Sequence, residues 1–453
     1  MRSLVWFRRD LRLDDHPALA AAAARGPVLG LFVVDPRLAA GTGPTRGWYL
    51  SEALGALEAS CGGHLVVRTG DPRAVVVDVA REVGADAVYV TGEPSPTGRR
   101  RDGEVASRLA AAGVAWRDVG TPYGVAPGVV RQPDGRPYAV FSAYARAWAR
   151  HGVDDVTARP DVTWLRARSE GAGALRAQVA RRRPAYFGDL PDGPAPARPA
   201  AGEEAAQRDL AAFVARVASY ADGRDEPGRD ATSRLSPHLR VGALHPRTVL
   251  AALDGAGLAA DAFRRQLVWR EFYADVLWHH PASAWRALRA PMASLPVDRG
   301  PAAEARFRHW ARGETGFALV DAGMRQLLAE GWMHNRARMV CASLLVKHLH
   351  LDWRWGARWF LWSLVDGDVA SNQHGWQWVA GTGTDAAPYH RIFNPERQAA
   401  RFDATGAYAR RYGAAPEGGS SARVAPLVDL ATERAEALAR FAQVRSASRG
   451  RVP

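Results

Sequence analysis

The sequence predicts an α/β amino-terminal domain with a parallel, Rossmann-like sheet, followed by a long connector and an all-α carboxyl-terminal domain. Three observations predict this layout. Short apolar runs alternate with alanine-rich stretches over the first 120 residues, the periodicity then fails in a segment rich in Pro, Gly and Ala, and apolar residues later recur at helical spacing. The expected boundaries are 1–125 for the α/β domain, 126–202 for the connector, 203–440 for the helical domain and 441–453 for a frayed tail.

The α/β domain is predicted from apolar runs that are typical of strands in a sheet buried on both faces. These runs lie at Leu4–Phe7, Val28–Val34, Leu65–Val67 and Val88–Val90. The helices expected between them include Pro17–Ala24, Trp48–Cys61 and Pro72–Val83. Proline favours the first turn of a helix, and Pro17 and Pro72 each stand at such a start.

Sheets of this kind often bind nucleotides, so the phosphate-binding loops are the next expectation to check. The sequence contains neither G-x-G-x-x-G after its first strand nor G-x-x-x-x-G-K-[ST] anywhere. The nearest candidate is Gly41-Thr42-Gly43-Pro44, in which proline removes a donor that a phosphate would need. We interpret this segment as an ordinary loop.

Beyond the first domain, we expect one helix in the connector, near Tyr138–His151. The helical domain then carries apolar residues three and four apart in six further segments. These are Asp209–Ala221, Ala262–His279, Ala303–Arg312, Phe317–Gly331, Asn335–His350 and Trp355–Leu364.

Composition narrows the class of protein. Hydrophobic residues make up 47% of the 453, enough for a sizeable core, and no apolar run approaches the ~18 residues of a membrane span. No secretory leader is evident, and we expect a cytoplasmic protein. Cys61 and Cys341 are the only cysteines, which argues against a disulfide framework or a cysteine-built metal site.

The net charge of +13 suggests a polyanionic partner, because almost all of it lies outside the first domain. Residues 1–125 hold 15 Arg against 14 Asp and Glu, and 11 of the 16 Trp lie between Trp269 and Trp378, among arginines. Aromatics among arginines suit a surface that stacks bases and neutralises phosphates. The alternative is that most of these tryptophans belong to a helical core.

Four clusters in the helical half could carry chemistry. Thr232–Pro237 has the composition of an anion-holding helix entrance or of an ordinary cap. On the helix expected at Ala262–His279, four polar and aromatic residues share one face, which suits the wall of a ligand cavity; a half-exposed amphipathic face is the alternative. The four are Gln266, Trp269, Arg270 and Tyr273. The third cluster spans Trp332–Met339, in which Arg338 could pair with a buried carboxylate.

The fourth cluster, Asp366–Asn372, places two carboxylates in apolar surroundings without a His or Asp at metal-ligand spacing, so we expect no metal. Carboxylates that hold Arg338 and hydrogen-bond a heterocycle fit the composition better. No G-x-S-x-G or other Ser-His-Asp signature supports hydrolysis.

At these residues the chain resembles the photolyase and cryptochrome flavoproteins, and within them it is most like the class I cyclobutane pyrimidine dimer photolyases. The matching motifs run in order along nearly the whole chain. They are Trp6-Phe7-Arg8-Arg9-Asp10-Leu11-Arg12, Trp269-Arg270-Glu271-Phe272-Tyr273, Gly331-Trp332-Met333-His334-Asn335-Arg336, Gly383-Thr384-Asp385-Ala386-Ala387-Pro388 and Arg391-Ile392-Phe393-Asn394-Pro395. The family has an α/β domain, a connector and a helical domain that holds FAD.

The resemblance implies a light-dependent enzyme that repairs pyrimidine dimers by electron transfer from excited, reduced FAD. Asp366 is expected to pair with Arg338 near the flavin, and Asn372 to face flavin N5, where the family's photolyases typically carry Asn. The full set implied for FAD is Tyr220, Thr232, Ser233, Arg234, Leu235, Ser236, Arg338, Asp366, Gly367, Asp368 and Asn372. Trp353 and Trp376 match an electron relay whose usual third, outer tryptophan has no counterpart in 296–303.

The implied partner is damaged DNA, bound by a monomer with no membrane contact. Trp269 and Trp378 match the indoles that embrace the flipped dimer, while Asn335 and Met339 match lesion contacts of cyclobutane-dimer enzymes. The full set implied for lesion and DNA is Arg224, Gln266, Trp269, Arg270, Tyr273, Asn335, Arg336, Met339, Trp378, Arg391 and Gln398. Gln266 replaces the usual glutamate and is more typical of (6-4) photolyases, so (6-4) repair is one alternative, and cryptochrome-like signalling is another.

An antenna pigment is the last expectation from the resemblance. Arg9, Asp35 and Arg46 resemble positions near a deazaflavin such as 8-hydroxy-5-deazaflavin. Arg100 replaces an acidic residue in the segment that would face it, and an empty pocket is the alternative.

Overall fold

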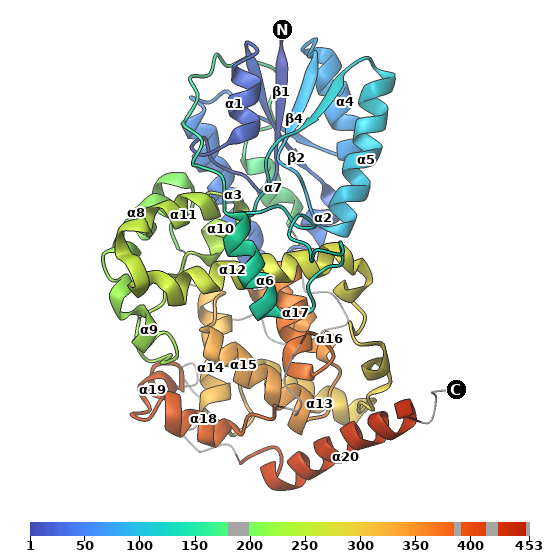
Figure 1. Cartoon of the computed structure of the whole chain (residues 1–453), viewed down its shortest axis with the longest axis vertical. Helices are drawn as coiled ribbons and strands as arrows, with labels where there is room; N and C mark the ends of the chain where they lie inside the picture. The colour runs from blue at the N-terminus through green and yellow to red at the C-terminus, as the bar shows by residue number, and fades with distance from the viewer. Residues whose placement is uncertain (180–198, 385–390, 414–424, 450–453) are drawn as a thin grey trace. The chain divides into compact units, whose positions relative to one another are not determined.

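The computed structural model describes residues 1–179, 199–384, 391–413 and 425–449 (Figure 1). Its contacts group these residues into two compact units. Unit 1 holds 1–179, 199–221 and 233–281; unit 2 holds 222–232 and the rest from 282 onward. The predicted domain boundaries stay predictions, and these units do not follow them. Parts of the expected connector and of the 383–388 motif lie outside the described residues.

A five-stranded parallel sheet forms the centre of the amino-terminal part, as predicted. Its order is β3-β2-β1-β4-β5, so the chain reverses direction across the sheet between β1 and β4. The strands are β1 (Ser3–Phe7), β2 (Val28–Val34), β3 (Val66–Thr69), β4 (Ala87–Val90) and β5 (Ala115–Asp118). The first four confirm the predicted runs, whereas β5 was not predicted.

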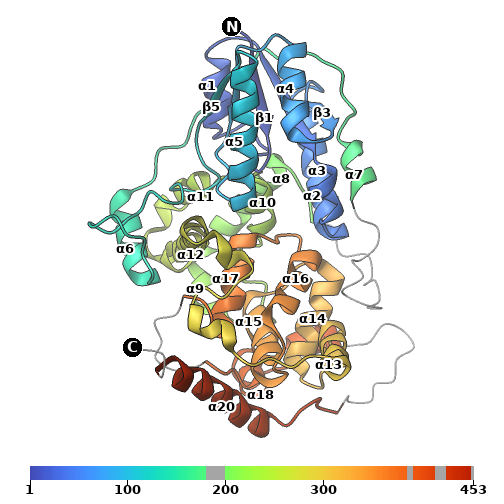
Figure 2. The ribbon, with the colours of Figure 1, turned by 90° about the vertical axis from the view of Figure 1, so that its right-hand side faces the viewer.

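Helices cover both faces of this sheet. Leu4, Trp6 and Leu31 face a core shared with α4 (Pro72–Glu82) and α5 (Pro96–Ala111), and α1 (Pro17–Ala23) lies on the opposite side (Figures 1 and 2). The turns that start these helices use capping side chains, since Asp71 accepts from Arg73 N and Ser95 from Gly98 N. Two further helices, α2 (Pro36–Ala40) and α3 (Pro44–Ser60), follow β2.

Unit 1 continues into helices that are fastened to the sheet by buried polar contacts. These helices are α6 (Phe141–His151), α7 (Gly173–Gln178), α8 (Glu203–Val214), α10 (Ser236–Val241), α11 (Pro246–Ala252) and α12 (Asp261–His279). Asp15, after β1, binds Arg247 at 2.7 Å and His245 at 3.2 Å. Gly242 has a φ of +73°, and a Cβ there would lie 1.9 Å from the carbonyl oxygen of Arg9, so only glycine permits this approach.

The regular secondary structure in the described residues of unit 2 is all helical. It contains α13 (Pro301–Arg312), α14 (Ala318–Glu330), α15 (Asn335–Ser343), α16 (Trp353–Ser363), α17 (Val369–Ala380), α18 (Pro395–Phe402), α19 (Ala407–Gly413) and α20 (Leu430–Arg449); α9 (Tyr220–Gly223) leads from unit 1 into unit 2. The helix predicted to run to His350 instead ends at Ser343 and continues as a π-helical turn, Leu344–His348. Lys347, the one lysine in the sequence, is buried there, 3.9 Å from the ring of Phe441.

The expected frayed tail is wrong for residues 441–449, which belong to α20. Phe441 and Val444 are buried against Met292, so tertiary packing keeps this helix in place. In the described residues, no helix is long and apolar enough to cross a membrane, and no group of His, Cys, Asp and Glu side chains could hold a metal ion.

Candidate functional site

An ion pair joins two of the predicted site residues in unit 2. Asp366, which follows α16, binds Nη2 of Arg338 on α15 at 2.9 Å through Oδ2, as expected. Nε of the same arginine donates to the carbonyl oxygen of Met333 at 2.8 Å. Oδ1 of Asp366 is buried and has no hydrogen-bond partner among the described residues. A buried carboxylate oxygen without a donor is costly, so this atom fits a ligand that supplies one.

The next residues start α17 and are held by its first turn. Asp368 is the N-cap of α17 and accepts from Ser371 N at 3.0 Å. One turn later, the amide nitrogen of Asn372 donates to Ala357 O at 3.0 Å and to Oε1 of Gln373 at 2.7 Å. Both amide protons are therefore used within the protein, and the carbonyl oxygen is the group that Asn372 can offer to a ligand.

Helix α15 carries three of the residues predicted to contact the lesion or the DNA backbone, Asn335, Arg336 and Met339. Exposed Asn335 and half-buried Met339 lie together, with Nδ2 of the amide 3.7 Å from the thioether sulfur. Arg336 binds Asp225 at 2.8 Å and lies 4.0 Å from the ring of Phe402. Arg224 is 4.0 Å from the same carboxylate. Asp225 thus partly neutralises two of the four arginines proposed to lie near the DNA backbone.

Trp378, at the end of α17, is half-buried and accompanied by cationic and aromatic groups. Arg391 lies 4.7 Å from its ring centre and Phe393 6.4 Å. Gln398 is on α18, with a buried Oε1 that has no partner among the described residues.

The two tryptophans predicted for the electron relay, Trp376 and Trp353, are almost fully buried. Trp376 packs 5.0 Å from the ring of Phe360.

In unit 1, α12 presents the four-residue face expected from the sequence. Its four members are all half-buried, while Leu267, Phe272 and the rest of the opposite face are buried. The indole of Trp269 stacks on Phe141 of α6, with ring centres 3.6 Å apart and planes 3° apart. Tyr273 lies 5.4 Å away, and Gln266 donates to Ala262 O at 3.2 Å.

Arg270 differs from the other members of this face because the protein itself holds its guanidinium. It donates to the carbonyl oxygens of Pro122 and Leu239, both at 3.2 Å, and lies 4.3 Å from the ring of Tyr123. These contacts give it a structural role within unit 1. A contact with the DNA backbone remains a prediction.

Sequence reasoning missed Glu271, which organises this helix from its buried side. Its carboxylate accepts from Gly124 N at 2.6 Å, from Val125 N at 3.1 Å and from the indole nitrogen of Trp148. Burial raises the pKa of Glu271, and these donors oppose that rise. The available signal was an acidic residue at an otherwise apolar position of α12.

The residues predicted to surround the FAD phosphates differ in burial, since some are buried and Arg234 is exposed. Tyr220 packs against Phe213 and Phe263, and Leu235 is fully buried, so these two contribute to the core of unit 1. Arg234 is exposed and has a φ of +52°, a conformation that few residues other than glycine adopt. Ser233 Oγ accepts from Leu235 N at 3.3 Å within the turn before α10, and the N-cap of α10, Leu235, has no side-chain capping bond.

The residues proposed for an antenna pigment lie on or after β1, β2 and α3, and each already interacts within the protein. Arg9 is 3.7 Å from Glu93, which follows β4. Asp35 caps α2 and binds Arg37 at 2.8 Å. Arg46 lies in the first turn of α3. An antenna at these positions remains a prediction.

Two models of known protein families match this chain. The family model described as "DNA photolyase" matches residues 3–161, and that described as "FAD binding domain of DNA photolyase" matches residues 263–417. The chain belongs to the DNA photolyase family. The deoxyribodipyrimidine photo-lyase of Agrobacterium fabrum is 37% identical to this family member over 90% of this chain and 86% of its own. That of a Thermus thermophilus strain is 39% identical over 95% and 96%.

Solved structures agree with this family assignment. A bacterial class III photolyase from Agrobacterium tumefaciens superimposes with a TM-score of 0.87 at 35% identity, covering 98% of both chains. A Synechocystis cryptochrome superimposes with a TM-score of 0.84 at 25% identity, covering 97% of this chain and 99% of its own. The expected assignment to class I stays a prediction. The FAD-binding domain of this photolyase-family chain includes the Asp366–Arg338 pair, whose spare oxygen suits the cofactor.

Proposed function

We propose that the chain repairs cyclobutane pyrimidine dimers in DNA in a light-dependent reaction. The observation that carries the proposal is the Asp366–Arg338 pair, whose unpartnered carboxylate oxygen lies in a domain of the family's FAD-binding type. Relatives at 37–39% identity bear the name deoxyribodipyrimidine photo-lyase, which supports the choice of substrate.

The residues of this chain would bind and orient the cofactor. Reduced FAD, once bound and excited by blue light, supplies the electron that splits the dimer. Asp366 would accept a hydrogen bond from it, with Arg338 holding the carboxylate in place. Asn372 would present its carbonyl oxygen, because Ala357 and Gln373 take both of its amide protons.

The lesion must leave the duplex, which costs a few kcal/mol and less for a damaged pair. Stacking on Trp269 and Trp378 would offset this cost by ~1–3 kcal/mol per base. Phe141 covers one face of Trp269 and keeps the indole oriented before DNA arrives. Asn335, which is exposed beside Met339, would supply a hydrogen-bond donor to a pyrimidine carbonyl.

The deciding experiment uses an oligonucleotide with one cyclobutane thymine dimer, and purified protein whose FAD is chemically reduced. We expect the dimer to disappear under blue light and to persist in the dark. Persistence of the dimer in the light, with reduced FAD still bound, would contradict the proposal. A parallel arm with a (6-4) lesion tests the alternative that Gln266 favours. If neither lesion is repaired while the flavin still responds to light, the result would favour signalling.

The role of Trp269 has a test of its own. Trp269→Ala should weaken binding to the damaged strand by ~1–3 kcal/mol while FAD stays bound. Phe141→Leu is the matched control, because it removes the stacking partner and keeps the indole. Equal losses in both variants would assign the effect to packing between α6 and α12 and would exclude Trp269 from the lesion site.

A further inference from the structure

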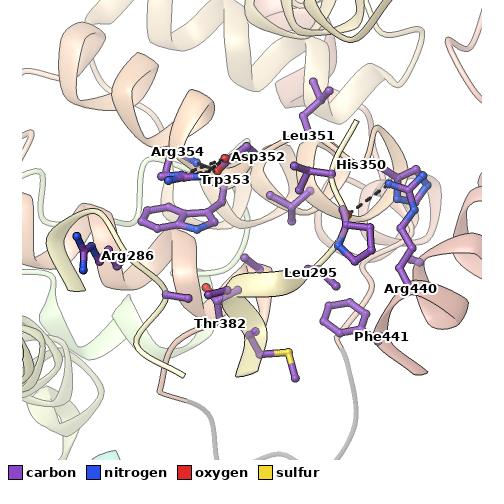
Figure 3. A pocket seen from close by; sticks show the side chains of 18 of the residues that line it. Arg286, Leu295, His350, Leu351, Asp352, Trp353, Arg354, Thr382, Arg440 and Phe441 are labelled. Carbon is purple, nitrogen blue, oxygen red and sulfur yellow. Dashed lines mark hydrogen bonds and ion pairs between the residues drawn. The ribbon is translucent and has the colours of Figure 1, made fainter. Parts of the chain in front are cut away.

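Unit 2 contains a cavity of about 210 Å³ that none of the residues proposed for FAD, lesion or DNA contacts lines (Figure 3). Segment 285–299, the turn 350–354, the end of α17 and one face of α20 enclose it. Its interior is largely aromatic and aliphatic. The side chains involved are Trp285, Met292, Leu295, Leu351, Trp353 and Phe441.

One buried polar atom faces this apolar interior. Thr382 is 2% exposed, and its hydroxyl has no hydrogen-bond partner among the described residues. The backbone of Thr382 is fixed on both sides, because its N–H donates to Gln377 O at 3.0 Å and its carbonyl oxygen accepts from Arg289 N at 2.9 Å. Figure 3 shows the side chain at the cavity, with Trp353 and Leu295 nearby. A buried hydroxyl without a partner is costly and therefore suits a ligand.

Four arginines give the cavity a positive rim. Arg354 binds Asp352, and Arg440 binds Asp298 at 2.8 Å and Glu436 at 2.6 Å. The other two, Arg286 and Arg299, are exposed and have no acidic partner in the part of the chain that the structure describes. Asp352 is the one carboxylate that lines the cavity, so the uncompensated charge at its mouth is positive.

We propose that this cavity binds a small aromatic carboxylate. Its one- or two-ring body would lie against Trp353 and Phe441, a polar atom would pair with the Thr382 hydroxyl, and its anionic group would lie near Arg286 and Arg299. The size is appropriate, since a cavity of ~150 Å³ already accommodates benzene. Guanidinium groups pair with carboxylates through charge-assisted hydrogen bonds. The proposal is independent of the repair activity.

The test is calorimetric titration of the FAD-loaded protein with 2-naphthoate, and with 2-naphthamide as its uncharged counterpart. We expect naphthoate to bind at one site and naphthamide at least ~10-fold more weakly, because charged hydrogen bonds are the stronger kind. Thr382→Val should weaken naphthoate ~2- to 10-fold, as the loss of one hydrogen bond predicts. The ligand-free variant should melt no lower than the parent, because the lost hydroxyl had no partner.

Three further variants separate specific binding from general attraction to a basic protein. Ala293→Trp, at the exposed rim, should block the cavity and abolish binding. Arg286→Gln should weaken naphthoate but not naphthamide. Arg289→Gln, at an exposed neighbour that does not line the cavity, should change neither. No binding by the parent protein, unchanged binding by Ala293→Trp, or equal weakening by Arg289→Gln would each overturn the proposal; flavin content confirms that every variant is folded.

Discussion

One carboxylate oxygen of Asp366 pairs with Arg338, and the other has no partner among the described residues. The same side chain can therefore stabilise unit 2 and accept a hydrogen bond from the flavin that we propose. Asp366→Asn should strip most FAD during purification and destabilise unit 2 by about 3 kcal/mol. This is the lower end for a broken buried pair, because Arg338 is 25% exposed. Flavin absorbance per chain and a melting curve measure both effects. The control is Asp352→Asn, which breaks an ion pair whose arginine, Arg354, is 44% exposed. This variant should keep its flavin.

Lys347 shows how a single buried cation makes stability depend on pH. Burial lowers its pKa from the usual 10.5 to about 7, so between these values the unfolded chain binds more protons than the folded one. Stability therefore rises with pH in this window and falls as pH drops through 7. Relative to Lys347→Met, the wild type should gain about 2 kcal/mol between pH 7 and pH 9, because the folded-state lysine is already half deprotonated at pH 7. Urea unfolding of both proteins at pH 7 and pH 9 measures this gain. If the difference in their unfolding free energies does not change with pH, the lowered pKa of Lys347 is contradicted.

Residue-level prediction succeeded where partners were near in sequence or chemically obvious. Carboxylates in apolar surroundings predicted a partner for Arg338, and the family resemblance identified Asp366 as that partner. The stacking of Trp269 on Phe141 was not predictable, because helical spacing says which residues share a face and nothing about what lies opposite. The same reason hid the three donors that meet at Glu271.

At the scale of elements, α12 depends on Glu271 to hold the segment that follows β5. Glu271→Gln replaces one acceptor oxygen with a donor, which would leave Gly124 N–H or Val125 N–H unpaired. We expect a loss of ~1–3 kcal/mol in unfolding free energy, the cost of one unsatisfied buried group. Chemical denaturation measures it. Glu304→Gln, exposed on α13, should change stability by less than ~0.5 kcal/mol.

The elements that sequence reasoning missed share a physical cause. β5 reads Ala-Trp-Arg-Asp and lies at an edge of the sheet, so its residues are half-buried or exposed and lack the apolar run of an inner strand. α20 has almost no amphipathic pattern over its 20 residues and is held by a few side chains, Phe441 and Val444 among them. Inner strands β1 and β2, by contrast, are apolar except for Ser3 and were predicted within one residue.

For the whole molecule, the main expectation concerns charge, because the net +13 is concentrated outside the first 125 residues. Affinity for damaged duplex should fall with salt, with a slope of about −0.9 per neutralised phosphate on B-DNA. Arg391→Gln should make this slope shallower by about 0.9. Arg100→Gln, exposed on α5, should leave it unchanged. Binding that does not vary with salt, or equal effects of the two variants, would place the DNA elsewhere.

The predicted fold class was correct for the whole chain, and the predicted boundary at 202 differs from the division into units. Helical spacing identifies helices but not the elements on which they pack. α11 belongs with the sheet because Arg247 and His245 meet Asp15 in a buried cluster, which no local pattern could show. The sequence therefore predicted one boundary at residue 202, whereas in the structure helices beyond that residue pack in the same unit as the sheet.

The burial of Lys347 also bears on how this chain is cut by proteases. A lysine-specific protease has a single cleavage point in the sequence, the bond between Lys347 and His348, and both side chains are 1% exposed. Cleavage can therefore proceed only when this part of unit 2 opens, and its rate would report that opening directly. One limited digestion with and without a ligand would then show whether binding at either proposed site holds unit 2 closed.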